Sequence, residues 1–286
     1  MNGERGYVWL GRLGSAVADV FVPRRCIHCK ALLTTPFGGD APGSAGRPGG
    51  GEWPGGGEWP GGGEWPGGAA PHFSGLCGAC RHVLHACEIP VTEMPFHIDA
   101  WPLAVRWVFS DGSPIRSVHH AFKYEGRPEL ADFLATSLMA ALRRLAAMDD
   151  LQQGVVVPVP SHRLRILERG YCQAAVLAGR AARHLGCRAA PGALARREHA
   201  GSQTRLHAHQ RLANVHQAFQ VRSVPDGDPI ILIDDVVTTG ATLHACATRL
   251  QHAVNTGMPT ASRPTILLAA PAIRPPLPLG RILRAC

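Results

Sequence analysis

Residues Ile230 to Thr242 read I-I-L-I-D-D-V-V-T-T-G-A-T and constrain the fold more than any other segment. The run of apolar residues predicts a strand buried on both faces, as parallel sheets contain. Two carboxylates and a Thr/Gly turn follow it, and the apolar spacing after Gly240 predicts a helix over 241–254. The turn would then lie at the carboxyl end of a parallel strand, where open α/β sheets bind ligands.

The residues of this turn suit a phosphorylated sugar. Gly240 lets the backbone approach a ligand closely, and the N–H groups from Thr238 to Thr242 stand at a helix N-terminus, which favours an anion. Asp234 and Asp235 would repel a phosphate that faced them, so they are better placed to accept hydrogen bonds from sugar hydroxyls or to support a divalent cation. The turn therefore predicts a ribose 5-phosphate site. A Walker loop is excluded, because G-x-x-x-x-G-K-[ST] does not occur.

A second apolar stretch is followed by basic residues. Gly154–Pro160, G-V-V-V-P-V-P, predicts a short strand ended by proline, with a helix expected over 171–185. Between them lie Arg163, Arg165 and Arg169. Guanidinium groups suit pyrophosphate oxygens, so this segment is a candidate anion site. The alternative is a solvated basic loop, since arginine is spread through the whole chain.

The strand, the paired aspartates and the V-V-T-T-G-A-T turn resemble the phosphoribosyl pyrophosphate loop of type I phosphoribosyltransferases. The resemblance implies that Asp234 and Asp235, as the catalytic pair, hold the ribose hydroxyls in the presence of Mg²⁺. It implies that the 5-phosphate is wrapped by Thr238, Thr239, Gly240, Ala241 and Thr242. It also implies that pyrophosphate is bound by Pro160, Ser161, His162, Arg163 and Arg169. Purine-salvage members carry Asp at the position of Thr238, so the resemblance argues against purine salvage.

Three further stretches resemble signatures of the ComF family: Pro158–Gln173, Ala121–Ala131 (A-F-K-Y-E-G-R-P-E-L-A) and Gln203–Phe219. ComF proteins join a short cysteine-bearing region to a phosphoribosyltransferase-like domain and are tied to DNA uptake in natural competence. The implied partners are single-stranded DNA and a competence helicase. The resemblance also implies that five further residues contact the ligand or belong to a lid: Lys123, Tyr124, Arg127, Gln203 and Thr204. The chain departs from the family at Cys172, where members commonly have Asn.

Two C-x-x-C motifs, Cys26-Ile-His-Cys29 and Cys77-Gly-Ala-Cys80, have the spacing of zinc knuckles. A structural Zn²⁺ held by these four cysteines is the favoured interpretation, with a redox site or unbound thiols as the alternative. The long separation of the knuckles is explained by low-complexity sequence, because residues 49–66 are three tandem copies of G-G-G-E-W-P. The repeat tryptophans could bind a partner or stack on single-stranded bases, or the repeat is slippage in a tolerant loop.

These observations predict an α/β fold in three parts. An amphipathic helix is expected over 1–22, and a zinc-ribbon-like region over 23–92 with a disordered insert at about 34–75. Residues 100–286 would form the phosphoribosyltransferase-like domain, a mostly parallel sheet flanked by helices. Its predicted strands are 103–109, 154–159, 190–195, 229–234 and 264–270. One helix is predicted to end near residue 123, and three more are predicted over 128–147, 171–185 and 241–254. The polar loop 196–206 is a candidate lid.

The net charge of +8 is almost wholly due to arginine, which fits either a DNA-binding surface or a coding bias. The apolar stretch near the N-terminus is too short and too interrupted for a membrane span, and it does not make a convincing signal peptide. A cytoplasmic protein is therefore expected. Two functions remain open. One is an enzyme that transfers a phosphoribosyl group, and the other is a non-catalytic module that senses a ligand or binds single-stranded DNA.

Overall fold

The computed structural model describes residues 24–33, 75–90, 96–197 and 218–274. These residues fall into two compact units, an N-terminal unit that ends at Arg81 and a main unit that begins at His82. The predicted helix over 1–22, the Glu-Trp-Pro repeats, and Gln203 and Thr204 of the candidate lid lie outside the described residues. Among the described helices, none is both long and apolar enough to cross a membrane.

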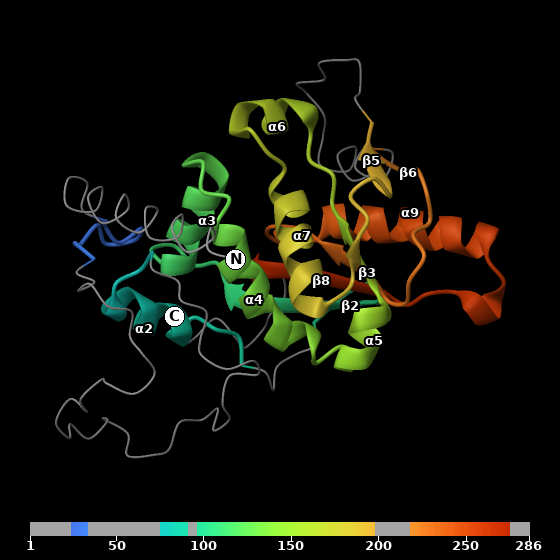
Figure 1. Ribbon diagram of the computed structural model, residues 1–286, viewed down its shortest axis with the longest axis horizontal. Coiled ribbons are helices and arrows are strands. Elements are labelled where there is room, and N and C mark those ends of the chain that lie inside the picture. Colours follow the sequence, from blue (N-terminus) through green and yellow to red (C-terminus); the bar gives the residue numbers. More distant parts are fainter. Residues whose placement is uncertain (1–23, 34–74, 91–95, 198–217, 275–286) are drawn as a thin grey trace, which may run out of the picture. The chain divides into compact units, whose positions relative to one another are not determined.

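The main unit is built on a six-stranded sheet with the order β1-β2-β8-β7-β3-β4. Figure 1 labels β2, β8 and β3 of this sheet. Only the pair formed by β1 (Phe96–Ile98) and β2 (Trp101–Val108) is antiparallel. All other neighbours are parallel, through β8 (Ile266–Ile273), β7 (Ile230–Ile233), β3 (Val155–Pro158) and β4 (Arg188–Ala189). The predicted mostly parallel sheet is therefore confirmed, and so are the predicted strands that correspond to β2, β3, β7 and β8.

The central strands are apolar because helices cover both faces of the sheet. Every residue of β3, β7 and β8 is buried. Helices α4 (Leu130–Leu142) and α7 (Gln173–Leu185) pack on each other and over β2, β8 and β3. Helix α9 (Ala241–Gly257) returns from β7 to β8 and packs on these two strands. Because the return to β8 runs in the opposite direction along the sheet, a right-handed crossover puts α9 on the other face.

Three local predictions were wrong. The helix predicted over 128–147 ends at Leu142, and a separate helix α5 (Met148–Gln153) follows. No helix was predicted for the basic segment after β3, but it forms helix α6 (Arg163–Arg169). The His162 side chain caps its start by accepting from the Leu164 N–H at 3.2 Å, and Gly170 ends it in a left-handed conformation.

The single strand predicted over 190–195 is two shorter strands. Arg188–Ala189 joins the main sheet as β4, and β5 (Leu194–Arg196) pairs instead with β6 (Phe219–Val221) in a separate antiparallel sheet. Pro191 and Gly192 separate the two strands, and this dipeptide favours a turn over a continuous ladder. The segment preceding the predicted lid therefore belongs to a small sheet of its own.

Candidate functional site

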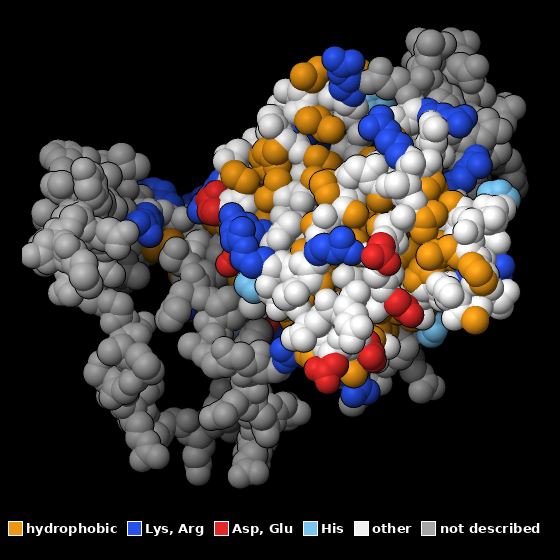
Figure 2. All heavy atoms as spheres, turned by 45° about the vertical axis from the view of Figure 1, so that its right-hand side comes forward, with side chains coloured by type: hydrophobic (Ala, Val, Ile, Leu, Met, Phe, Trp, Pro, Cys, Tyr) orange, Lys and Arg blue, Asp and Glu red, His pale blue; other side chains and the backbone are white. Residues whose placement is uncertain are grey.

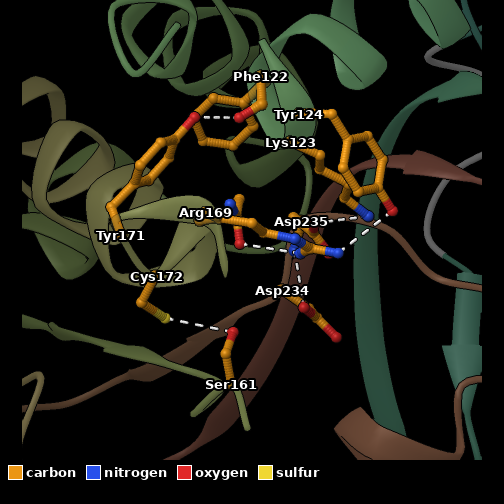
Figure 3. Close-up of polar contacts among 10 residues, drawn as sticks. Phe122, Lys123, Tyr124, Ser161, Arg169, Tyr171, Cys172, Asp234 and Asp235 are labelled. Carbon is orange, nitrogen blue, oxygen red and sulfur yellow. Dashed lines mark hydrogen bonds and ion pairs between the residues drawn. The ribbon is translucent and has the colours of Figure 1, made fainter. Parts of the chain in front are cut away.

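The carboxyl ends of β3 and β7 lie side by side. Pro158 is in register with Ile233, and the Val159 N–H donates to the Ile233 carbonyl at 2.9 Å. Asp234 and Asp235 therefore leave the sheet next to the segment Pro160–Ser161 that follows β3. The end of α3 (Pro114–Tyr124) brings Lys123 to the same edge, as Figure 3 shows. Residues from three separated segments thus meet where the first prediction located the site.

Lys123 and Asp235 form an ion pair at this edge. The Lys123 Nζ lies 2.7 Å from Asp235 Oδ2, and the two side chains are 18% and 14% exposed. Burial acts to raise the pKa of Asp235, but the positive charge of Lys123 and its hydrogen bond outweigh burial, so the pKa lies below its ordinary value. Asp235 is therefore ionised and neutralised by one of the two lysines in the chain.

Asp234 has the opposite electrostatic character. Burial, followed by the negative charge of Asp235, raises the pKa of Asp234 to about 8. Its Oδ1 accepts a hydrogen bond from the Asp235 N–H at 2.8 Å. Near neutral pH, Asp234 is mostly protonated and Asp235 is ionised. The adjacent carboxyl groups can then act as one donor and one acceptor toward the hydroxyls of a sugar.

His119 is a neighbour of this pair that the sequence analysis missed. It is buried among aromatic rings, with ring centroids 5.5 Å from Phe109 and 6.4 Å from Phe122. Within the described residues, neither ring nitrogen has a hydrogen-bond partner. Burial lowers its pKa to about 4, so the imidazole is neutral. The sequence did contain a sign of this neighbour. His119 lies four residues before Lys123, one helical turn, so the two side chains face the same side of α3.

The loop from Thr238 to Gly240 leads into α9 with its amide groups available. The Val237 N–H donates to the Ala272 carbonyl, and the His244 N–H donates to the Gly240 carbonyl. Among the described residues, no backbone carbonyl accepts from the N–H groups of Thr238, Thr239 or Gly240. Thr238 and Thr239 are exposed. The loop therefore presents donors at the start of a 17-residue helix, an arrangement that attracts an anion.

Gly240 is required here by its conformation and by its neighbour. Its φ of 75° lies in the left-handed region, and a Cβ at this position would come within 3.0 Å of the Ile98 Cδ1. The end of β1 thus packs directly on the loop. Next to it, Asp99 Oδ2 lies 3.5 Å from His244 Nε2 on the first turns of α9. The antiparallel edge strands therefore brace the loop that precedes α9.

The residues predicted to bind pyrophosphate are only partly brought together. Arg169 turns back toward α3, where its Nη2 donates to the Tyr124 hydroxyl at 3.2 Å. Its Nη1 donates to Oε1 of Gln173, the first residue of α7, at 3.1 Å. Ser161 Oγ accepts from the Cys172 thiol at 3.4 Å, so a thiol stands where a side-chain amide was expected (Figure 3).

The other predicted residues of this segment are dispersed. Pro160 and Ser161 lie partly exposed at the sheet edge, His162 caps α6, and Arg163 is exposed on α6. Arg127, predicted as a ligand or lid residue, pairs with Glu129 at 2.7 Å. Arg196, the first residue of the candidate lid, ends strand β5. Burial and the charge of Arg165 lower its pKa, whereas Asp234 acts to raise it. These charges place Arg196 within electrostatic range of the acid pair. Over the main unit, Figure 2 shows basic side chains spread among uncharged and hydrophobic ones.

The N-terminal unit contains a cysteine quartet made of Cys26, Cys29, Cys77 and Cys80. Their Sγ atoms all lie within 4.8 Å of one another, and Cys29 Sγ is 3.6 Å from Cys77 Sγ. Four thiolates around Zn²⁺ stand about 3.8 Å apart, given Zn–S bonds of about 2.3 Å. The quartet therefore has the donor set and the spacing for a structural metal such as zinc.

Backbone hydrogen bonds join the two halves of the quartet. The Ile27 N–H donates to the Gly75 carbonyl at 2.9 Å, and the Cys77 N–H points to Cys26 Sγ at 3.4 Å. Burial acts to raise the pKa of Cys26, but backbone donors, the Cys77 N–H first among them, outweigh it and lower the pKa to about 6. Burial, followed by hydrogen bonds to the other three cysteines, raises the pKa of Cys80 well above its ordinary value. Because the thiolate is the ligand form, metal binding would deprotonate Cys80 as well.

The described residues thus define a class: an α/β protein with a mostly parallel sheet, an acid pair at its carboxyl edge and a cysteine quartet suited to a metal.

No protein-family model matches the chain. It is 30% identical to the DNA utilization protein YhgH of Escherichia coli K12 over 131 residues, which are 46% of this chain and 58% of the relative. It is 30% identical to competence protein F of Haemophilus influenzae over 135 residues, 46% of this chain and 59% of the relative. These similarities support the assignment of the chain to the ComF family. The chain spans less than two thirds of the length of these relatives.

Proposed function

We propose that the chain binds phosphoribosyl pyrophosphate, or a related phosphoribosyl ligand, at the carboxyl edge of the sheet. The observation that carries the proposal is the continuous unit formed by β7, the acid pair and the loop before α9. Two adjacent carboxyl groups stand a few residues before the N–H groups of Thr238, Thr239 and Gly240, which donate to no backbone carbonyl among the described residues. A ribose 5-phosphate needs both features, because its hydroxyls and its phosphate are separated by the length of the sugar.

Each part of the site has a distinct role in this proposal. Asp234 and Asp235 hold the ribose 2′- and 3′-hydroxyls, and the amides from Thr238 to Thr242 hold the 5-phosphate. Arg169 and the segment from Pro160 to Arg163 face the pyrophosphate. Mg²⁺, when bound with the ligand, would neutralise phosphate charge. The ion pair with Lys123 must rearrange as the ligand arrives, since Lys123 lies on Asp235 Oδ2.

The names of the curated relatives connect the proposal with DNA. DNA utilization protein YhgH and competence protein F match the same share of this chain. We infer that the phosphoribosyl site serves DNA uptake or utilisation in the cytoplasm, where thiolates of the cysteine quartet stay reduced and able to bind zinc. Single-stranded DNA and a competence helicase are the partners this role would require.

Binding without turnover is the second candidate function. Thr238 stands where purine-salvage enzymes carry an aspartate that faces the base, and a threonine hydroxyl is a poor acid or base near neutral pH. The site could therefore sense its ligand rather than transfer it. Pyrophosphate release distinguishes the two: release with any candidate acceptor favours a transferase, and binding without release favours a sensor.

The proposal is tested by calorimetric titration of phosphoribosyl pyrophosphate with Mg²⁺. We expect the double variant Asp234→Asn/Asp235→Asn to bind at least tenfold more weakly than the wild type, because a hydrogen bond to a charged group contributes about 1.5–3 kcal/mol. Asp226→Asn is the matched control, since Asp226 is 99% exposed and its carboxylate pairs only loosely with Arg188, at 3.8 Å. Equal affinity of the wild type and the double variant would exclude the acid pair from the site.

A further inference from the structure

Tyr124 is a large aromatic side chain that the fold leaves in solvent. It is the last residue of α3, and 62% of it is exposed. Phe122, two residues earlier in the same helix, is fully buried and provides the aromatic core side chain of this segment. Tyr124 therefore contributes little apolar burial to folding, and the contacts that it does make are polar.

Those contacts hold the ring in one position. The Cζ atom of Arg169 lies 4.9 Å from the ring centroid, and its Nη2 donates to the hydroxyl at 3.2 Å. The same guanidinium donates through Nη1 to Gln173 Oε1, on a buried residue that begins α7. The ring of His120 approaches from within α3, with centroids 5.1 Å apart. An exposed ring held in this way loses little conformational freedom when a ligand stacks on it.

The ring also stands next to the acid pair. Lys123 precedes Tyr124, and its ammonium fixes the end of α3 to Asp235 at 2.7 Å. In Figure 3, Tyr124 and Arg169 lie on the same side of the sheet edge as Lys123 and Asp235. A group attached to a sugar bound at the acid pair would therefore have the tyrosine ring and the arginine within its surroundings.

We propose that Tyr124, held by Arg169, is a stacking subsite for a nucleobase. Exposed aromatic rings and guanidinium planes are the groups on which bases stack, and the stacking does not depend on base identity. The positive charge of Arg169 favours a ligand that carries phosphate as well. The inference rests on the proposed phosphoribosyl site and extends it, because it makes the ligand a nucleotide rather than a sugar phosphate alone.

The test compares two ligands that share the ribose 5-phosphate group. Affinities for ribose 5-phosphate and for adenosine 5′-monophosphate are measured by calorimetry in the full chain, and the ratio of the two is the readout. We expect the wild type to prefer the nucleotide by about tenfold, within the range of about 5- to 150-fold typical of one stacked base. Tyr124→Leu should lower the ratio to about one, whereas Tyr124→Phe should keep most of it because it retains the ring.

A control variant and a third ligand complete the test. Leu167→Ala removes an exposed side chain from α6, where Leu167 is 69% exposed, and should leave the ratio as in the wild type. A short single-stranded oligodeoxynucleotide, measured in parallel, identifies the source of the base. If Tyr124→Leu weakens only the oligonucleotide, the base belongs to a strand, and if it lowers only the mononucleotide ratio, the base belongs to a free nucleotide.

The outcomes separate this inference from the proposed function. If the wild type binds ribose 5-phosphate but shows no preference for the nucleotide, and Tyr124→Leu changes neither nucleotide nor oligonucleotide binding, the stacking subsite is wrong and the phosphoribosyl site stands. If the wild type binds neither ribose 5-phosphate nor phosphoribosyl pyrophosphate, the proposed function itself fails.

Discussion

Cys77→Ser protein should lose its zinc and the order of the N-terminal unit around residues 24–33 and 75–81. Removing one of four ligands leaves an incomplete tetrahedron, and structural zinc sites contribute roughly 10–16 kcal/mol of apparent binding free energy that is also folding free energy. The described segments of this unit are short, and the cysteine quartet and the hydrogen bond from Ile27 to Gly75 connect them. No other prediction for this chain carries so large an effect.

Elemental analysis of purified protein checks the zinc content, with one equivalent expected for the wild type and close to none for Cys77→Ser and Cys26→Ser. Hydrogen exchange supplies a second readout, since the amides of Ile27 and Lys30 should lose protection together with the metal. Cys187→Ser is the control, because Cys187 lies outside the quartet in the main unit. Unchanged zinc in both quartet variants would rule out this site.

Replacing Asp235 and replacing Asp234 by asparagine should change stability in opposite directions at pH 7.5. Asp235→Asn leaves the Lys123 ammonium partly buried without its carboxylate, which we expect to cost about 2–3 kcal/mol, somewhat less than for a fully buried pair. Asp234→Asn removes a carboxyl group that the fold keeps protonated, and the amide oxygen can still accept from the Asp235 N–H. We therefore expect Asp234→Asn to stabilise the main unit at this pH.

The pH dependence gives each variant its own signature. Because the folded pKa of Asp234 is about 8 and its ordinary value is 3.8, the folded chain binds more protons between these values, and its stability falls as pH rises. The gain from Asp234→Asn should therefore vanish below about pH 4. The pKa of Asp235 is lowered instead, so its contribution is present above 3.8 and is lost as pH falls through the folded pKa.

Urea unfolding at pH 4 and pH 7.5 measures these differences. In a Lys123→Met background, Asp235→Asn should cost far less, because no unpaired cation is left behind. If Asp234→Asn and Asp235→Asn shifted stability by the same amount and in the same direction at pH 7.5, the two carboxyl groups would be electrostatically equivalent, contrary to the interpretation of their contacts.

Much of the local structure could be predicted because it depends on neighbours in the chain. The apolar runs of β3 and β7, the glycine at position 240 and the two C-x-x-C motifs carry their information within a few residues. Helix α6 could not be predicted in this way. Its leucines, Leu164 and Leu167, have helical spacing but are exposed, and none of its residues is buried, so no core-facing stripe marks the helix. The remaining signals were the His162 cap and Gly170.

The electrostatics of the acid pair could not be predicted either. In the sequence, Asp234 and Asp235 are equivalent neighbours, and Lys123 lies more than a hundred residues away. Folding brings Lys123 and His119 to Asp235, whereas among the described residues Asp234 forms no ion pair. Tyr124 and Arg169, also far apart in sequence, meet in the same way.

The sequence by itself determined the kinds of element, the cysteine pairs and the loop that ends β7, since each depends on side chains and backbone freedom within a short window. The tertiary structure alone decided the order of the strands, which carboxyl group is charged and which ring stands beside it. These depend on contacts between distant segments, and such contacts form only when the sheet buries its apolar strands and brings their ends to a common edge.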